Sequence, residues 1–300
     1  SRKRFPNGLK EVTDYIRSKG MIPGVWLEIE VMGIKCPMAE TVCDDSWFFT
    51  RHGKRVFDRS RYQLDFRNPK VIAHAHKVID RLVSEYGVGY IKMDNNIEPG
   101  IGTEQSCDSV GDGLLQHEKA YLAWLDGIFK KYPKLIIENC SSGGHRIEPS
   151  MMALADLASF SDAHEEKEIP VIAANLHRVI LPAQSGIWAV LRSKDPDKRL
   201  AYSVAATFLG TPCVSGDIYD LNAHQWALVD EGVAFYRQAS DIIEKGESTF
   251  YGPELGSYRK LEGWQGVLRR GEDGRTLLVL HTFGGMTGQE ISIPVGQDYS

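Results

Sequence analysis

The chain has 300 residues, of which 42% are hydrophobic and 25% charged, with a formal net charge of −5 and a pI near 6.0. This length accommodates one large domain or two ordinary ones, and the acidic balance does not indicate a nucleic-acid partner. No apolar run approaches the roughly 20 residues that a membrane-spanning helix needs, so no membrane partner is expected either.

The order strand, loop, helix repeats along most of the chain, which is typical of a parallel sheet covered by helices. Helices are expected where apolar residues recur every three to four positions between a capping residue and a glycine. These helices span 9–19, a segment opened by Asn68-Pro69 and ended by Gly87, a segment around 121–129, 197–209 and 222–245. Apolar or alternating runs predict strands at 21–31, 89–94, 135–140, 157–162, 187–190 and 212–217.

The pattern changes after residue 248. Two strands at 264–269 and 276–283 flank a Gly-Glu-Asp-Gly turn, and a short strand is expected at 290–294. We therefore expect a barrel domain over 1–248 and a C-terminal antiparallel β domain over 249–300, itself open to being incomplete. Because a (β/α)8 barrel closes with eight strands and six are found, the expected fold is α/β, a TIM-type barrel that lacks its first strands through N-terminal truncation.

The strand around residue 92 carries charges on one face. Successive side chains alternate, so Tyr90, Lys92 and Asp94 share one side while Ile91 and Met93 share the other. Charges inside an apolar strand are costly unless they are paired or used. At the C-terminal end of a barrel strand Asp94 would point into the catalytic mouth, although a structural Lys-Asp ion pair is an equal alternative.

Alternation in the strand at 25–31 places Trp26, Glu28 and Glu30 on one face, where an indole and two acids could line a sugar-sized pocket. The alternative is an edge strand with a solvated polar face. The strand at 135–140 is followed by two serines and Gly143-Gly144, which let the backbone approach a ligand closely. Arg146 can then hold a carboxylate or hydroxyls, and Cys140 is interpreted as a buried or substrate-lining thiol.

Asp162 stands at the end of the strand at 157–162. Two carboxylates on separate barrel strands are the minimal equipment for glycoside hydrolysis, because one attacks or activates water while the other protonates the departing oxygen. Lys92 is expected to keep Asp94 ionised, and Phe160 to shield Asp162 so that it holds its proton. His164 and its acidic neighbours have no second cluster with ligand spacing, so neither a metal nor another cofactor is predicted.

Several short sequence motifs between residues 5 and 245 match, in the same order, those of a known enzyme family. They are FPNGLK (5–10), YIRSKGM (15–21), GVWLEIE (24–30), QLDFRNP (63–69), YIKMD (90–94), ENCSSGG (138–144) with Arg146, and SD (161–162). With them the chain resembles the family 36 glycoside hydrolases, the α-galactosidase and α-N-acetylgalactosaminidase group related to melibiases. The chain departs from the family pattern at three places. At Met93 the family commonly has Trp, and this side chain should face the helices. At His145 the family has a smaller residue, and the segment 163–165 also differs.

The resemblance implies a retaining mechanism with Asp94 as the nucleophile and Asp162 as the acid/base. It places Lys92, Trp26, Cys140 and Arg146 in the sugar pocket and, by looser alignment, Arg59 beside it. Together with the pattern-based candidates Glu28, Gly143 and Gly144, these form the expected substrate-binding set. Family members also carry an N-terminal β domain and an early strand with an aspartate pair.

The expected function is an exo-acting retaining α-galactosidase that hydrolyses terminal α-galactosides through a covalent glycosyl-aspartate. The alternatives are an α-N-acetylgalactosaminidase of the same family, a transglycosylating relative of the raffinose-synthase kind, or an inactive, carbohydrate-binding fragment. The partner is an oligosaccharide or glycoconjugate ending in α-galactose or α-N-acetylgalactosamine, and a homo-oligomer remains open. Five scattered cysteines without a C-x-x-C pair favour a reduced, cytoplasmic protein, with a secreted parent as the alternative.

Overall fold

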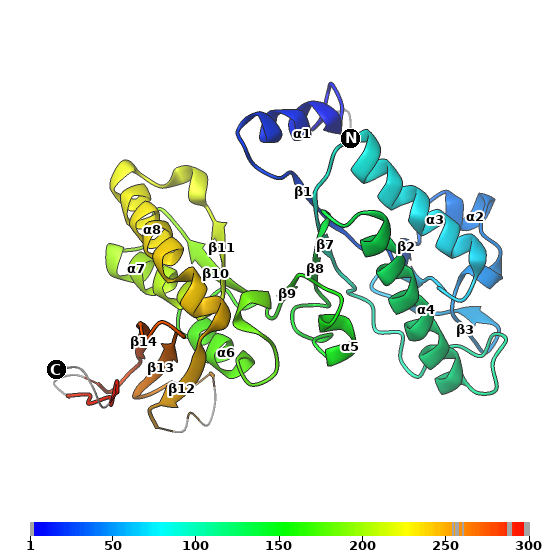
Figure 1. Cartoon of the computed structure of the whole chain (residues 1–300). Helices are drawn as coiled ribbons and strands as arrows, with labels where there is room; N and C mark the ends of the chain where they lie inside the picture. The colour runs from blue at the N-terminus through cyan, green and yellow to red at the C-terminus, as the bar shows by residue number, and fades with distance from the viewer. Residues whose placement is uncertain (1–2, 254, 256–257, 260, 287–289, 297–300) are drawn as a thin grey trace. The chain divides into compact units, whose positions relative to one another are not determined.

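The computed structural model describes residues 3–253, 255, 258–259, 261–286 and 290–296 (Figure 1). The chain divides into two compact units, Ser1–Asp156 and Leu157–Ser300. Each unit contributes three parallel strands with covering helices, so all six parallel strands expected from the sequence are present among the described residues, mostly with shorter bounds. Every helix in this part of the chain is too short or too polar to cross a bilayer.

In the first unit the parallel strands are ordered β1–β7–β8. Their bounds are β1 Gly24–Leu27, β7 Tyr90–Met93 and β8 Ile136–Asn139. The longer helices are α1 Leu9–Ser18, α3 Pro69–Asp80 with a π-helical extension η2 Arg81–Glu85, and α4 Val110–Lys131. Shorter helical turns are α2 Met38–Thr41, η1 Asp45–Trp47 and α5 Pro149–Met152. Helices α3 and α4 run alongside each other in Figure 1, and the ring centroids of His76 and Trp124 lie 6.1 Å apart.

Local sequence explains where these elements begin. The side chain of Asn68 accepts a hydrogen bond from the backbone of Lys70 at 2.9 Å, and Pro69 occupies the first helical position of α3. In β7 the alternation holds, since Ile91 and Met93 are 0% and 3% exposed while Tyr90 and Lys92 are half-buried. Met93 thus faces the core, as expected, and its departure from the family pattern leaves the opposite face unchanged.

The segment between β1 and α3 contains short strands that the sequence analysis missed. They are β2 Val31–Gly33, β3 Thr50–Arg51, β4 Lys54–Arg55, β5 Phe57–Asp58 and β6 Arg61–Gln63. They form a β2–β6–β5 sheet and a β3–β4 hairpin. The strand expected over 21–31 is wrong beyond residue 27, because the chain turns at Ile29 and Glu30 and Val31 pairs with Gln63 instead.

In the second unit the parallel strands are ordered β9–β10–β11. They span β9 Leu157–Ser159, β10 Ser185–Leu191 and β11 Thr211–Gly216. The helices are α6 Glu168–Leu176, which was not expected, α7 Asp197–Ala206 and α8 Ala223–Lys245. Single 3-10 turns are η3 Pro182–Gln184, η4 Thr207–Leu209 and η5 Ile218–Asp220. A capping box between Asn222 and Gln225 begins α8, so its expected start is confirmed to within one residue.

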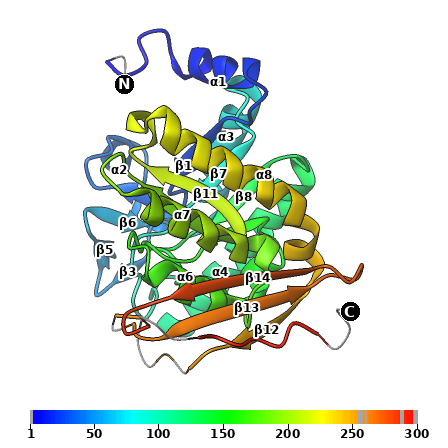
Figure 2. The same ribbon diagram turned by 90° about the vertical axis from the view of Figure 1, so that its left-hand side faces the viewer.

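Three antiparallel strands complete this unit and lie edge to edge in Figure 2. They are β12 Glu247–Tyr251, β13 Trp264–Arg270 and β14 Thr276–Thr282. The expected hairpin is confirmed, β12 was missed, and the strand expected at 290–294 is wrong for these described residues. The division into a barrel domain over 1–248 and a β domain over 249–300 stays a prediction.

Candidate active site

Asp94 is the residue that follows β7 at its C-terminal end, and its side chain is almost enclosed. The residue is 7% exposed, and four N–H groups donate to its carboxylate. Trp26 Nε1 and Asn96 Nδ2 lie 2.9 and 2.7 Å from Oδ2, while the backbone nitrogens of Asn95 and Ser142 lie 2.8 and 3.3 Å from Oδ1. All four N–H groups stabilise the ionised form of Asp94, so this environment favours a carboxylate over a protonated carboxylic acid.

The pKa of Asp94 follows from this geometry. Burial raises it, but hydrogen bonds from Trp26, Asn96, the thiol of Cys140 and the backbone of Ser142 outweigh burial and hold the pKa below its usual value. The ionised state agrees with the sequence analysis, whereas its cause differs. Donors from neighbouring loops and strands, rather than the nearby lysine, are the main stabilising groups.

Lys92 has a different principal partner. Its Nζ lies 3.1 Å from Oε1 of Glu138, and Tyr90 donates its hydroxyl to the same carboxylate. Burial lowers the pKa of Lys92, but the charge of Glu138, with smaller contributions from Cys140 and Asp94, leaves it raised. The strand register explains the contact, since Trp26, Lys92 and Glu138 stand opposite one another on β1, β7 and β8. This row of three side chains lies beside Asp94.

Trp26 both contacts Asp94 and remains partly open to solvent. Its indole nitrogen is bound to Asp94, yet the residue is 54% exposed. Glu28 lies just past the end of β1, where it accepts hydrogen bonds from Arg61 Nε at 2.9 Å and from the backbone of Asn96 at 3.2 Å. Both residues therefore contact the loop that carries Asp94, as the shared strand face predicts.

A tight turn after β8 brings Ser142 to Asp94. Ser142 and Gly143 have φ values of 43° and 83°, and Ser141 donates its backbone N–H to the carbonyl of Gly143 at 3.1 Å. Glycine adopts the left-handed conformation readily, so Gly143 supports this turn. Close approach of a ligand to the two glycines remains a prediction. Burial raises the pKa of Cys140 to about 12, which agrees with a buried thiol.

Glu30 and Arg146 lie in the interior rather than on the face expected for them. Glu30 is 1% exposed, because the chain turns after β1, and Arg146 Nη1 lies 2.6 Å from Glu30 Oε1. The guanidinium also stacks over the ring of Tyr121 at 5.1 Å, and His117 Nε2 lies 3.5 Å from Glu30. Arg146 thus holds a carboxylate as predicted, but that carboxylate belongs to the protein. Its contact with a sugar remains a prediction.

Arg59 lies in the exposed turn between β5 and β6, with φ at 45° and its side chain 60% exposed. Its guanidinium is 3.9 Å from Asp58 and 3.8 Å from Glu98, which belongs to the loop after β7. The distances are those of loose ion pairs, so the side chain has room to turn toward a ligand. A sugar contact at Arg59 is a prediction.

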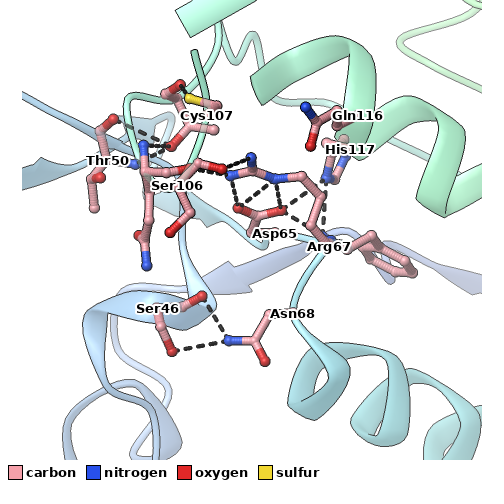
Figure 3. A network of polar contacts seen from close by, with 12 residues as sticks. Ser46, Thr50, Asp65, Arg67, Asn68, Ser106, Cys107, Gln116 and His117 are labelled. Atoms are coloured by element: carbon pink, nitrogen blue, oxygen red, sulfur yellow. Dashed lines mark hydrogen bonds and ion pairs between the residues drawn. The ribbon is translucent and has the colours of Figure 1, made fainter. Parts of the chain in front are cut away.

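A polar network braces the same long loop from its other end (Figure 3). Arg67 forms a two-point ion pair with Asp65, at 2.9 and 2.6 Å, and donates to the backbone carbonyl of Gln105 at 2.7 Å. The backbone of Phe66 donates to Nδ1 of His117 on α4 at 3.0 Å. The QLDFRNP stretch therefore ties the loop at 103–107 to the start of α3, which keeps the segment after Asp94 in place.

Asp162 belongs to the second unit, three residues beyond the end of β9, and is exposed. Because the side chain of Asp162 is exposed, the expectation that Phe160 shields it is wrong. The backbone of Ala163 donates to Ser161 Oγ at 2.9 Å, which shapes the turn around the carboxylate. Within the described part of the chain, no three His, Cys, Asp or Glu side chains gather as metal ligands would.

Asn96 and Ser142 both donate hydrogen bonds to Asp94 but were not expected as site residues. Neither lies on a periodic element, so no pattern marks them. The only local signal was the position of each residue just after a strand end, where parallel strands place functional groups.

The fold is a partial TIM-type barrel with a hydrogen-bonded carboxylate at a strand end. The Melibiase family model matches residues 1–246, and the chain belongs to this family, among the family 36 α-galactosidases. The resemblance stated from the sequence motifs is therefore confirmed.

Two curated relatives illustrate the extent of the match. α-Galactosidase AgaA of Geobacillus stearothermophilus is 22% identical over 268 residues, which are 84% of this chain and 35% of the relative. α-Galactosidase Mel36A of Lactobacillus acidophilus is 24% identical over 149 residues, 49% of this chain and 20% of the relative. The matches thus span about a fifth to a third of the curated relatives' length.

Solved structures show the fold. The crystal structure of AgaA from G. stearothermophilus superposes with a TM-score of 0.83 and 19% identity, covering 97% of this chain and 41% of that one. The α-galactosidase from Lactobacillus brevis gives a TM-score of 0.78 at 21% identity, covering 91% and 37%. The expected fold class, a partial TIM-type barrel followed by an antiparallel sheet, is confirmed.

Proposed function

We propose that this chain belongs to an exo-acting retaining α-galactosidase in which Asp94 is the nucleophile and Asp162 the acid/base. The observation that carries the proposal is the Asp94 carboxylate, buried at the C-terminal end of β7 and held ionised by donors from three strand ends. Membership of the Melibiase family supports the substrate class. Two structures of AgaA variants are described in complex with raffinose and with stachyose, so that relative binds oligosaccharides.

The first step forms a covalent intermediate. A carboxylate oxygen of Asp94 attacks the anomeric carbon of a terminal α-galactoside, and the bond to the leaving oxygen breaks while Asp162 gives that oxygen its proton. In the second step Asp162 takes a proton from water, whose oxygen attacks the same carbon and releases Asp94. Two inversions return the α-anomer.

The remaining residues have distinct tasks in this proposal. The exposed face of Trp26 stacks on the sugar ring, and Lys92, neutralised in part by Glu138, donates to hydroxyls. Glu28, Arg59, Cys140, Gly143, Gly144 and Arg146 complete the proposed lining of the pocket. A reduced, cytoplasmic setting remains a prediction. The five cysteines all lie in the described part of the chain and form no disulfide there.

The two carboxylates can be told apart by chemical rescue in the full-length protein. With Asp94→Gly, azide should restore turnover of an activated α-galactoside and yield the β-galactosyl azide, because a single inversion remains. With Asp162→Gly, azide should replace water in the second step and yield the α-azide. The control is Asp126→Ala, which removes an exposed carboxylate on α4 and should leave turnover near normal.

Two outcomes would refute the proposal: an Asp94→Gly protein that turns over an aryl α-galactoside at a near-normal rate, or initial release of the β-anomer by the unmodified enzyme. A parallel assay with the aryl α-N-acetylgalactosaminide tests the substrate. Preference for that substrate would replace α-galactosidase by α-N-acetylgalactosaminidase with the same catalytic pair.

A further inference from the structure

Asn96 and Ser142 form a hydrogen-bonded pair over the Asp94 carboxylate. Asn96 Nδ2 donates to Asp94 Oδ2 at 2.7 Å, and Asn96 Oδ1 accepts from the hydroxyl of Ser142 at 2.7 Å. The backbone of Ser142 donates to the other carboxylate oxygen at 3.3 Å. Asp94, Asn96 and Ser142 therefore close a ring of contacts in which both carboxylate oxygens take part.

The carboxylate of Asp94, which can only accept hydrogen bonds, determines which way the amide of Asn96 faces, and the hydroxyl of Ser142 completes the arrangement. An amide has one acceptor oxygen and one donor nitrogen, and the wrong orientation would place its oxygen against the carboxylate. With Nδ2 directed at Asp94, Oδ1 faces Ser142, whose hydroxyl donates to it and holds the side chain of Asn96 in this position. Ser142 thus acts on Asp94 twice, directly through its backbone and indirectly through the amide.

Neighbouring contacts hold both loops in register. Ser141 Oγ donates to the carbonyl of Asn95 at 2.9 Å, and the backbone of Asn96 donates to Glu28 at 3.2 Å. Ser142 keeps the left-handed backbone, φ 43°, that presents its N–H to Asp94. A residue held in this conformation by its surroundings is typical of sites where geometry matters more than local preference.

We infer that Asn96 and Ser142 are a positioning pair that fixes the orientation of the Asp94 carboxylate for attack on the anomeric carbon. The inference rests on the proposed function, since it gives the pair its task in that reaction. Neither residue contacts the reacting atoms in this role; each acts through Asp94. Preorganised donors of this kind contribute because they need no reorientation during the reaction.

The test compares three variants of the full-length protein with the unmodified enzyme. Asn96→Ala should lower kcat/KM by about 10- to 100-fold, the loss expected for one hydrogen bond to a charged group. Ser142→Ala should lower it less, and the double variant should be no slower than Asn96→Ala alone, because the hydroxyl of Ser142 acts through the amide. The control is Asn175→Ala on α6, whose side chain donates to the carbonyl of Val171.

The pH profile separates positioning from a merely structural role. Loss of the Asn96 donor should raise the pKa of Asp94 and move the acidic limb of kcat/KM to higher pH by about one unit. Asn96→Asp should move it further, through like-charge repulsion. The other titratable groups around Asp94 are Lys92 on β7, Glu138 on β8, Cys140 after β8 and Glu28 after β1, and all are unchanged in these variants. An unmoved limb in Asn96→Ala would overturn the inference.

A measurement that needs no turnover distinguishes this failure from failure of the proposed function. The carboxyl carbon of Asp94 can be titrated by 13C NMR, with its signal assigned by its loss in Asp94→Asn. A raised pKa in Asn96→Ala would support the pair even if the protein did not hydrolyse α-galactosides, in which case the proposed function would fall. Normal hydrolysis by the unmodified enzyme with an unchanged Asp94 titration in Asn96→Ala would overturn the positioning pair alone.

Discussion

Glu30 and Arg146 form a two-point ion pair inside the first unit, with N–O distances of 2.6 and 3.2 Å. Their side chains are 1% and 12% exposed. Burial raises the pKa of Glu30, but the charges and hydrogen bonds of Arg146 and His117 lower it to about 2. Each charge is tolerated in the interior only because the other is present.

Breaking this pair from one side should therefore be costly. Glu30→Gln leaves the guanidinium of Arg146 buried without its counter-charge and should reduce the free energy of unfolding by about 3–5 kcal/mol. Urea unfolding monitored by circular dichroism measures the change. The exposed Lys10–Asp14 pair on α1 supplies the control, because Asp14→Asn should change the free energy of unfolding far less than Glu30→Gln does. Equal effects of the two substitutions would contradict this account.

Gly232 on α8 faces α7 at close range, since a Cβ built on it would lie 2.2 Å from Val204 Cγ1. Gly232→Ala should destabilise the protein by about 1–3 kcal/mol through overpacking, despite the better helix propensity of alanine. Adding Val204→Ala should recover part of the loss. Gly127→Ala on α4, where no atom lies within 4 Å of the new Cβ, should instead stabilise by about 1 kcal/mol. The unfolding temperatures of the unmodified protein, the two Gly232→Ala proteins and Gly127→Ala measure these effects. A stabilising Gly232→Ala would refute the close packing of Gly232 against Val204.

Cys140 should be chemically inert in the folded protein. It is 2% exposed, and burial raises its pKa to about 12, so almost no thiolate is present near neutral pH. Iodoacetamide at pH 8 should label the half-buried Cys36 and Cys107 long before Cys140. Peptide mass spectrometry over time gives the rates, and denaturant should remove the difference. Labelling of Cys140 as fast as Cys36 in the native protein would show that the thiol is not enclosed.

His281 on β14 should make the second unit sensitive to acid. The residue is 1% exposed, packs edge-on against Tyr202, and burial lowers its pKa to about 4. The unfolded chain, with a His pKa of about 6.5, binds more protons between these values. Stability is thus complete above about pH 6.5 and falls as the pH drops toward 4, by at most about 3 kcal/mol.

The loss of stability on acidification can be measured as the change in the urea unfolding midpoint between pH 7 and pH 5. His281→Phe should reduce this change, because the titrating group is gone, whatever the substitution does to stability at pH 7. His145→Phe, at an exposed position, should leave the pH dependence as it is in the unmodified protein. An unaltered pH dependence in His281→Phe would exclude this histidine as the source.

Elements with a regular apolar period could be predicted from the sequence. The six parallel strands, α8 with its cap and the hairpin of β13 and β14 all carry such a period or a turn signal. The shared face of Trp26, Lys92 and Asp94 followed from strand alternation, and the register of β1 with β7 agrees. The strands β2 to β6 have only two or three residues each, too few for a period to be visible.

By itself the sequence determined the α/β class, the family motifs and the strand end that carries Asp94, because each depends on neighbours within a few residues. Tertiary structure decided which partners those residues have. Arg146 binds Glu30 across 116 positions, and Ser142 reaches Asn96 across 46, so neither contact has a local signal. The charge state of Asp94 likewise depends on burial and on donors from separate strands, which exist only once the chain has folded.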